Sequence, residues 1–193
     1  MRGFVITAVL ALASTMGMTA TAPAAAQAPA WEMDPAASRL EFVGRQNDDA
    51  VRGGFNDFTA SIRFAPDDLE GASIRIEVDM TSVEVEGSER GEILRGSAWL
   101  GVEDFPTAVF TADAIEAVAG GGYRALGTLE IKGYERPVPL AFDVVITDGR
   151  AVADGRADLV RTNFDVGPEG AVFGVRVAPE VDVLFHIEAV RAG

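Results

Sequence analysis

The sequence predicts an all-β domain of antiparallel strands, and three observations support this fold class. Apolar and polar residues alternate with period two in several runs, which is typical of strands that have one covered face. Short segments rich in Gly, Asp and Pro separate these runs, whereas parallel strands would need crossovers of about a dozen residues or more. One long segment, residues 86–106, lacks the alternation and interrupts the series.

Taken in order, the alternating runs amount to about eight strands joined mostly by short loops. In the run VRGGFNDFTASIRF (51–64) the phase slips between Phe55 and Phe58. A bulge or kink at 56–57 would keep both rings on one face. The other runs keep their phase: RLEFVG (39–44), ASIRIEVDM (72–80), YRALGTLEI (123–131), VPLAFDVVI (138–146), AVADGRADL (151–159) and VDVLFHIEA (181–189).

The segment SERGEILRGSAWL, residues 88–100, predicts a short helical insertion. Gly91 and Gly96 weaken this helix, each by up to about 1 kcal/mol relative to Ala. Phe105 precedes Pro106, which requires extended backbone and starts the next strand. Because a helix set between strands of a closed sheet often covers one end of the barrel, we interpret the 88–106 segment as a plug or lid.

The N-terminus predicts a cleaved signal peptide over residues 1–26. Arg2 supplies the positive start, FVITAVLALA (4–13) the apolar run, and Ala24-Ala25-Ala26 the small-residue cleavage site. The apolar run is shorter than the roughly 18 residues of a transmembrane helix. Residues 27–30 are then a linker and residues 31–193 a single domain, and we expect the protein in the periplasm.

Composition narrows the function classes. The 193 residues carry a formal net charge of −14 and no cysteine, which argues against nucleic-acid binding and excludes disulfides and thiolate metal sites. The single histidine, His186, alternates with apolar neighbours and is expected on the solvent face. Phosphate-loop, dinucleotide-fingerprint, nucleophile-elbow and HExxH motifs are missing from the sequence. We therefore predict no catalytic residue, no metal site and no enzyme activity.

Period-two alternation by itself leaves two architectures open, a sandwich and a barrel. Eight strands can close into a barrel with room for one small ligand. The small inward residues of AVADGRADL fit either an open interior or tight packing. From the pattern alone, the phenylalanine side chains belong to a packed core.

Five blocks of the sequence carry a resemblance to a known protein family and follow one another in the same order as in that family. WEMDPAASRLEF, VRGGFNDFTASIRFAPDD, SERGEILRGSAWLGVEDFPTAVFTA, GTLEIKGYERPVPLAF and LVRTNFDVG extend from Trp31 to near the C-terminus. In these blocks the chain resembles the YceI-like family of exported, lipocalin-like isoprenoid-binding proteins. Two positions depart from the family pattern: Gly91 follows Arg90 where many members have Asp, and Asp165 follows Phe164 where Gly is usual.

The resemblance implies an eight-stranded antiparallel lipocalin-like barrel with a short helical insertion at about 88–100. It also implies a long isoprenoid lipid, a polyprenyl chain or quinone tail, held in the lumen for transport or storage, with no other cofactor. Two alternatives stay open: a fatty-acid-derivative binder, and a non-catalytic accessory subunit of a membrane redox (b-type cytochrome) system. Transient contact with a membrane or a membrane redox protein, and a homodimer, are further partner hypotheses.

Under this interpretation the inward positions bind the lipid and the arginines near strand ends meet its headgroup. The expected lumen residues are Leu40, Phe42, Phe55, Phe58, Ile62, Phe64, Ile74, Ile76, Val78, Phe110, Leu129, Leu140, Phe142, Val144, Phe164, Val183 and Phe185. The expected headgroup residues at the mouth are Arg90, Trp99, Phe105 and Arg161.

Overall fold

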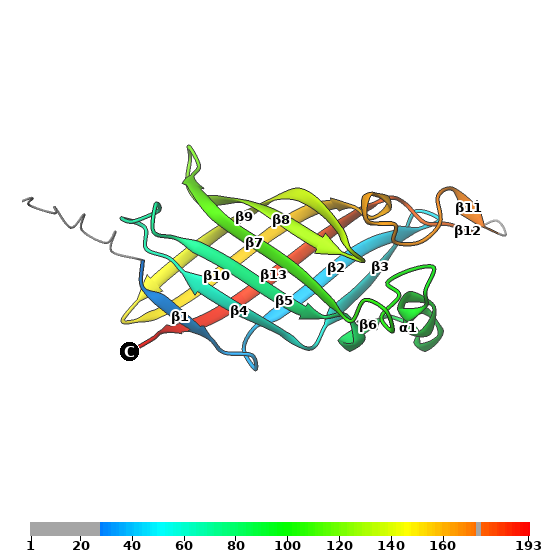
Figure 1. The fold of residues 1–193 in the computed structure, drawn as a ribbon, viewed down its shortest axis with the longest axis horizontal. Coiled ribbons are helices and arrows are strands. Elements are labelled where there is room, and N and C mark those ends of the chain that lie inside the picture. The colour runs from blue at the N-terminus through cyan, green and yellow to red at the C-terminus, as the bar shows by residue number, and fades with distance from the viewer. Residues whose placement is uncertain (1–27, 173–174) are drawn as a thin grey trace, which may run out of the picture.

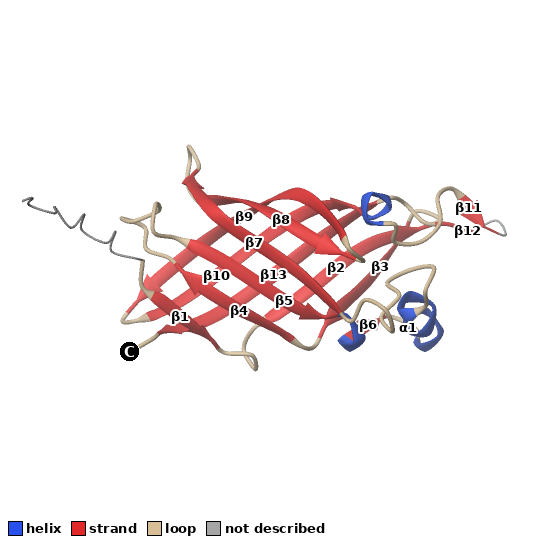
Figure 2. Ribbon diagram, in the orientation of Figure 1, coloured by secondary structure: helices blue, strands red, loops and turns tan. Residues whose placement is uncertain are grey.

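Eight antiparallel strands, some of them interrupted, close into a barrel, which confirms the predicted fold class (Figure 1; Figure 2). The structure is a computed structural model that describes residues 28–172 and 175–193. Three of the eight strands are each interrupted into two segments, so the sheet has eleven segments in the order β1-β4-β5-β7-β8-β9-β10-β13-β2-β3-β6. Pairing of β1 with β13 closes the ring. The predicted signal peptide lies outside the described residues.

The elements follow the predicted runs closely. In chain order they are β1 (Ala30–Met33), β2 (Arg39–Gln46), β3 (Asp49–Phe55), β4 (Phe58–Arg63), β5 (Ser73–Asp79), the 3₁₀ turn η1 (Met80–Ser82), β6 (Val83–Val85), α1 (Ser88–Arg95), β7 (Thr107–Ala117), β8 (Tyr123–Ile131), β9 (Tyr134–Thr147), β10 (Arg150–Val160), the 3₁₀ turn η2 (Arg161–Phe164), β11 (Ala171–Val172), β12 (Val175–Arg176) and β13 (Glu180–Arg191). A small hairpin, β11 with β12, forms a separate two-stranded sheet.

The three interrupted strands consist of β1 with β2, β3 with β4, and β5 with β6. Both β1 and β2 pair with β13, one beyond the other along its length. The break between β3 and β4 falls at 56–57, as predicted from the slip in phase. Phe58 is buried and Phe55 packs against the hydrophobic core, so the kink keeps both rings on the inner face.

The helical insertion is shorter than predicted. Helix α1 ends at Arg95, because the next residue, Gly96, leaves the helical conformation and donates its N–H to Ile93 O (3.1 Å). Turns continue to Phe105, and within them Leu100 and Val102 are buried. Figure 2 shows α1, η2 and the β11–β12 hairpin gathered at one end of the barrel, opposite the end that holds β1 and the C-terminus.

Residues 28–30, predicted as part of a linker, lie against the barrel wall. Ala28 is buried and its carbonyl accepts a hydrogen bond from Arg63 Nη1 (3.2 Å), while Pro29 O accepts from Phe64 N (3.1 Å). Ala30 already belongs to β1 and pairs with Arg63 of β4. The barrel wall therefore begins slightly before the expected domain boundary at Trp31.

Aromatic side chains close the end of the barrel that lies opposite α1. The Trp31 indole N–H donates to Phe64 O (2.9 Å), and the Arg191 guanidinium lies 5.5 Å from the centre of the Trp31 ring. The Phe64 ring makes an edge contact with Tyr123, with ring centres 4.9 Å apart. Phe142 stacks on Tyr123 at 5.5 Å. We call this end the floor of the barrel.

Three glycines let phenylalanine rings lie flat against the barrel wall. Gly155 on β10 faces Phe185 of β13 across the ladder, and Gly53 on β3 faces Phe42 of β2 in the same way. A Cβ atom at either glycine would lie less than 3.0 Å from the ring of its partner and from a backbone carbonyl. The third is Gly127 on β8, where the same construction meets the Phe110 ring.

We expect Gly155→Ala to destabilise the barrel by about 2 kcal/mol or more, since it overpacks a closed wall in which the Ala141 carbonyl cannot move aside. Gly44→Ala on β2 is the matched control, because no heavy atom lies within 4 Å of the added methyl. There the lost freedom of the unfolded chain should raise stability by about 0.4–1 kcal/mol. Urea unfolding of both variants measures the difference; equal midpoints would contradict the role of Gly155.

Candidate functional site: two cavities in the barrel

The lumen contains two cavities that follow one another along the barrel. The larger, about 250 Å³, lies at the end that carries α1, and we call it the mouth cavity. The smaller, about 60 Å³, lies near the floor, and we call it the floor cavity. Every residue that lines the floor cavity is apolar: Trp31, Ala60, Ile62, Phe64, Ile74, Ile76, Leu140, Phe142, Val144, Ala151, Ala153, Phe185, Ile187 and Ala189.

The mouth cavity is apolar inside and basic at its rim. Its polar lining residues are Arg45 and Gln46 at the end of β2, Arg90 on α1 and Arg161 at the start of η2. The carboxylates of the described residues take no part in the lining, although the chain carries 30 acidic residues. Ile93 of α1 lines the cavity and is still 58% exposed, so the cavity opens to solvent beside the helix.

Arg161 holds the rim together. It is only 6% exposed, and its guanidinium donates to four backbone carbonyls: Ala178 O (2.9 Å), Val166 O (2.6 Å), Pro168 O (3.0 Å) and Val177 O (2.8 Å). Burial lowers the pKa of Arg161, against the opposing effect of the Glu169 charge. The guanidinium therefore fixes both arms of the segment 166–178.

Trp99 completes this part of the rim. Its ring lies 5.3 Å from the Arg161 guanidinium, a distance that allows a cation–π contact. The ring also meets Gly167, where a Cβ atom would come within 3.0 Å of it. Gly167 N in turn donates to Ala98 O (2.9 Å). The lid segment after α1 and the loop after η2 are thus joined across the mouth.

Asp165 stands where glycine is usual in the resembled family, and the backbone explains that preference. Its φ is +54°, in the left-handed region that favours glycine and that Asp and Asn also adopt. Lys132 Nζ binds the Asp165 carbonyl oxygen (2.5 Å) and lies 3.2 Å from its Oδ2. The conformation needed for the turn is kept, and the departure adds an ion pair outside the mouth.

Most of the expected lumen residues do line a cavity. Four reach the mouth cavity and eight reach the floor cavity: Phe42, Phe55, Phe164 and Val183 in the first, and Ile62, Phe64, Ile74, Ile76, Leu140, Phe142, Val144 and Phe185 in the second. Five face inward or pack in the wall without lining either cavity: Leu40, Phe58, Val78, Phe110 and Leu129.

The expected headgroup residues divide differently. Arg90, Trp99 and Arg161 lie on the lining of the mouth cavity. Phe105 does not, because its backbone turns back on Gly101, whose carbonyl accepts a hydrogen bond from Phe105 N (2.9 Å). Its side chain is 39% exposed, and headgroup contact by Phe105 is the least supported of the four.

Sequence reasoning missed two kinds of lining residue. The period-two pattern placed Ala151, Ala153 and Ile187 on the inner face, but they were not named among the expected lumen residues, although that position was signal enough. Arg45 and Val177 reach the mouth because Gln46 and Val177 form an isolated bridge between segments 131 positions apart, for which the sequence holds no local signal.

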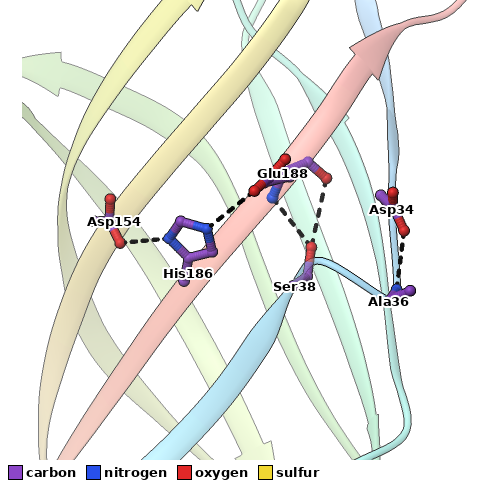
Figure 3. Close-up of polar contacts among 6 residues, drawn as sticks. All are labelled: Asp34, Ala36, Ser38, Asp154, His186 and Glu188. Carbon is purple, nitrogen blue, oxygen red and sulfur yellow. Dashed lines mark hydrogen bonds and ion pairs between the residues drawn. The ribbon is translucent and has the colours of Figure 1, made fainter.

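His186 lies on the outer face of β13, as predicted. Figure 3 shows its ring between two carboxylates, with Nδ1 2.7 Å from Asp154 Oδ1 and Nε2 3.6 Å from Glu188 Oε1. Across the described residues, no group of three or more His, Cys, Asp or Glu side chains is placed to hold a metal ion. Helices long and apolar enough to cross a membrane are likewise missing from the described part of the chain.

Comparison with known proteins decides the family. The model of the YceI-like domain matches residues 31–189, which is most of the chain. This chain belongs to the YceI-like family. A UPF0312 protein of Yersinia pestis is 33% identical over 88 residues, which cover 46% of this YceI-like chain and 45% of that protein. A UPF0312 protein of Yersinia enterocolitica is 27% identical over 150 residues, or 72% and 73% of the two chains.

Solved structures agree with the YceI-like barrel. BcnA of Burkholderia cenocepacia is 29% identical, with a TM-score of 0.76, and the match covers 82% of this chain and 100% of BcnA. A polyisoprenoid binding domain from Saccharophagus degradans, implicated in plant cell wall breakdown, superposes with a TM-score of 0.64 over 85% and 99% of the two chains. Its identity of 14% makes it evidence for the fold alone.

Proposed function

We propose that this YceI-like protein is an exported, non-catalytic carrier that holds the apolar chain of an isoprenoid lipid in the barrel. The observation that carries the proposal is the lumen itself, an apolar floor cavity in line with a larger cavity whose polar lining, among residues 28–172 and 175–193, consists of Arg45, Gln46, Arg90 and Arg161 at the rim. A ligand with a long hydrocarbon chain and one polar end matches that order. The Saccharophagus neighbour, described as a polyisoprenoid binding domain, supports this ligand class by analogy.

The energetics favour retention of such a chain. Each methylene removed from water contributes about 0.8 kcal/mol, and ordering the flexible chain takes back part of the gain. Observed affinities end near about −18 to −21 kcal/mol whatever the buried area, so a long chain supplies more apolar surface than retention needs. Selectivity must then come from the depth of the lumen and from the rim. The acidic exterior would keep the loaded carrier soluble.

The first test is native mass spectrometry of the protein purified from the periplasm of its own cells, followed by denaturation and identification of any released lipid. We expect one isoprenoid, a polyprenyl compound or a quinone, per barrel. A fatty-acid derivative would keep the carrier role and change the ligand class. An empty protein that also takes up no polyprenol in vitro would overturn the proposal and favour the accessory-subunit role, which co-purification with a membrane redox protein would test.

A further inference from the structure

The two cavities are separated by one layer of side chains. On β13, Val183 lines the mouth cavity and Phe185, the next inward residue, lines the floor cavity. Two residues along a strand advance about 6.6 Å. A chain that fills the mouth cavity therefore ends within one side-chain layer of the floor cavity, and Phe185 stands at that step.

The Phe185 ring lies against the wall instead of across the lumen. It occupies the place that a side chain at position 155 would take, because Gly155 is its direct partner in the ladder between β10 and β13. Side chains change between a few staggered rotamers, and those that leave the Gly155 surface direct the ring into the lumen. The Gly155 surface thus keeps the Phe185 ring to one side of the step between the two cavities.

The other two phenylalanines on glycine surfaces are placed differently. Phe42, over Gly53, lines the mouth cavity only, and Phe110, over Gly127, lines neither cavity. Phe185 alone among the three borders the floor cavity. This difference singles out one position, although the local geometry of all three pairs is similar.

We propose that Phe185, packed against Gly155, sets how far the lipid chain enters the barrel, and that the floor cavity receives the distal end of the chain. This inference rests on the proposed function and adds a chain-length determinant to it. Beyond the floor cavity the lumen is closed, because Trp31 is buried there and its indole N–H donates to Phe64 O. The floor therefore limits the longest chain, and Phe185 controls access to its last segment.

The test uses a series of polyprenols that differ by one isoprene unit, with affinity measured for the wild-type protein and for three variants. Wild-type affinity should rise with each unit and then level off. Phe185→Trp, whose larger ring fills more of the step between the two cavities, should level off at least one unit earlier, with a loss of about tenfold or more for longer chains. Phe185→Leu should keep or lengthen the range. Phe110→Leu, the matched control, should change stability but not the length at which affinity levels off.

A second measurement does not depend on mutants that fold well. A polyprenol with a photoreactive group at its distal end should label the wild-type peptides that contain Ala153 and Ile187, both on the floor cavity. Labelling only around the mouth, or the same length profile in folded Phe185→Leu and Phe185→Trp, would overturn the inference and leave the carrier function standing. Wild-type protein that binds no polyprenol of any length would overturn the proposed function itself.

Discussion

Phe142→Glu is expected to prevent folding or to abolish lipid uptake. Phe142 is buried on the inner face of β9, lines the floor cavity and packs against Phe64 and Tyr123. Truncating such a ring costs about 3–5 kcal/mol, and the new carboxylate would lie among apolar side chains without a partner. The sum approaches the whole stability of an ordinary domain, about 5–15 kcal/mol.

The matched control lies one position away on the same strand. Ala141 is exposed on the outer face and pairs with Arg124 of β8 and Arg156 of β10. Ala141→Glu would therefore place the same carboxylate between two cations, where it should fold and bind lipid as the wild type does. Circular dichroism and lipid extraction of both variants give the comparison. A folded Phe142→Glu protein with unchanged lipid content would mean that the facing of β9 is wrong.

Arg161→Ala is expected to disorder the rim and to release bound lipid. The substitution leaves four backbone carbonyls without their donor, and one of them, Val166 O, is buried. Hydrogen bonds to charged groups contribute about 1.5–3 kcal/mol each and do not simply add, so we expect a loss of about 3 kcal/mol or more. Arg161→Lys should recover little, because a single ammonium cannot reach two arms of a loop at once.

The readouts separate this rim effect from a general loss of stability. Amide hydrogen exchange should rise in residues 165–172 and 175–178 and around Trp99, while the strands at the floor stay protected. Arg156→Ala is the control, because its partners Asp158 and Asp182 are exposed and such surface pairs contribute little to stability. Unchanged exchange in the loop of Arg161→Ala would show that the segment is held by other contacts.

The Arg161 geometry also changes the expectation for the headgroup. Four of its five N–H donors bond backbone carbonyls of the protein itself, so little hydrogen-bonding capacity is left for a headgroup. Arg90 donates once, to Glu86 O (3.1 Å), and like Arg45 it forms no ion pair with a described carboxylate. If the proposed function holds and a lipid headgroup lies at the mouth, Arg45 and Arg90 are its better-placed cationic partners, and the first of these was not predicted.

Strand facing could be predicted because it depends on neighbours in the sequence. A period of two places Phe142, Val144 and Phe185 on one face whatever the rest of the chain does, and even the slip at 56–57 leaves its trace in the spacing of Phe55 and Phe58. The same local rule put His186 on the outer face. The closed barrel, by contrast, came from the family resemblance, since a sandwich would bury the same alternating residues.

The tertiary structure alone decided which inward residues meet open space and which fill the wall. Leu129 and Phe110 share the face of Phe185 but line no cavity, because that depends on what the opposite strands place in front of them. The role of Arg161 was hidden for the same reason, since its acceptors lie at two separate places along the chain, 166–168 and 177–178. The local alternation of apolar and polar residues determines on which face of the sheet each side chain lies. Packing across the barrel determines which of the inward side chains line a cavity and which residues form its rim.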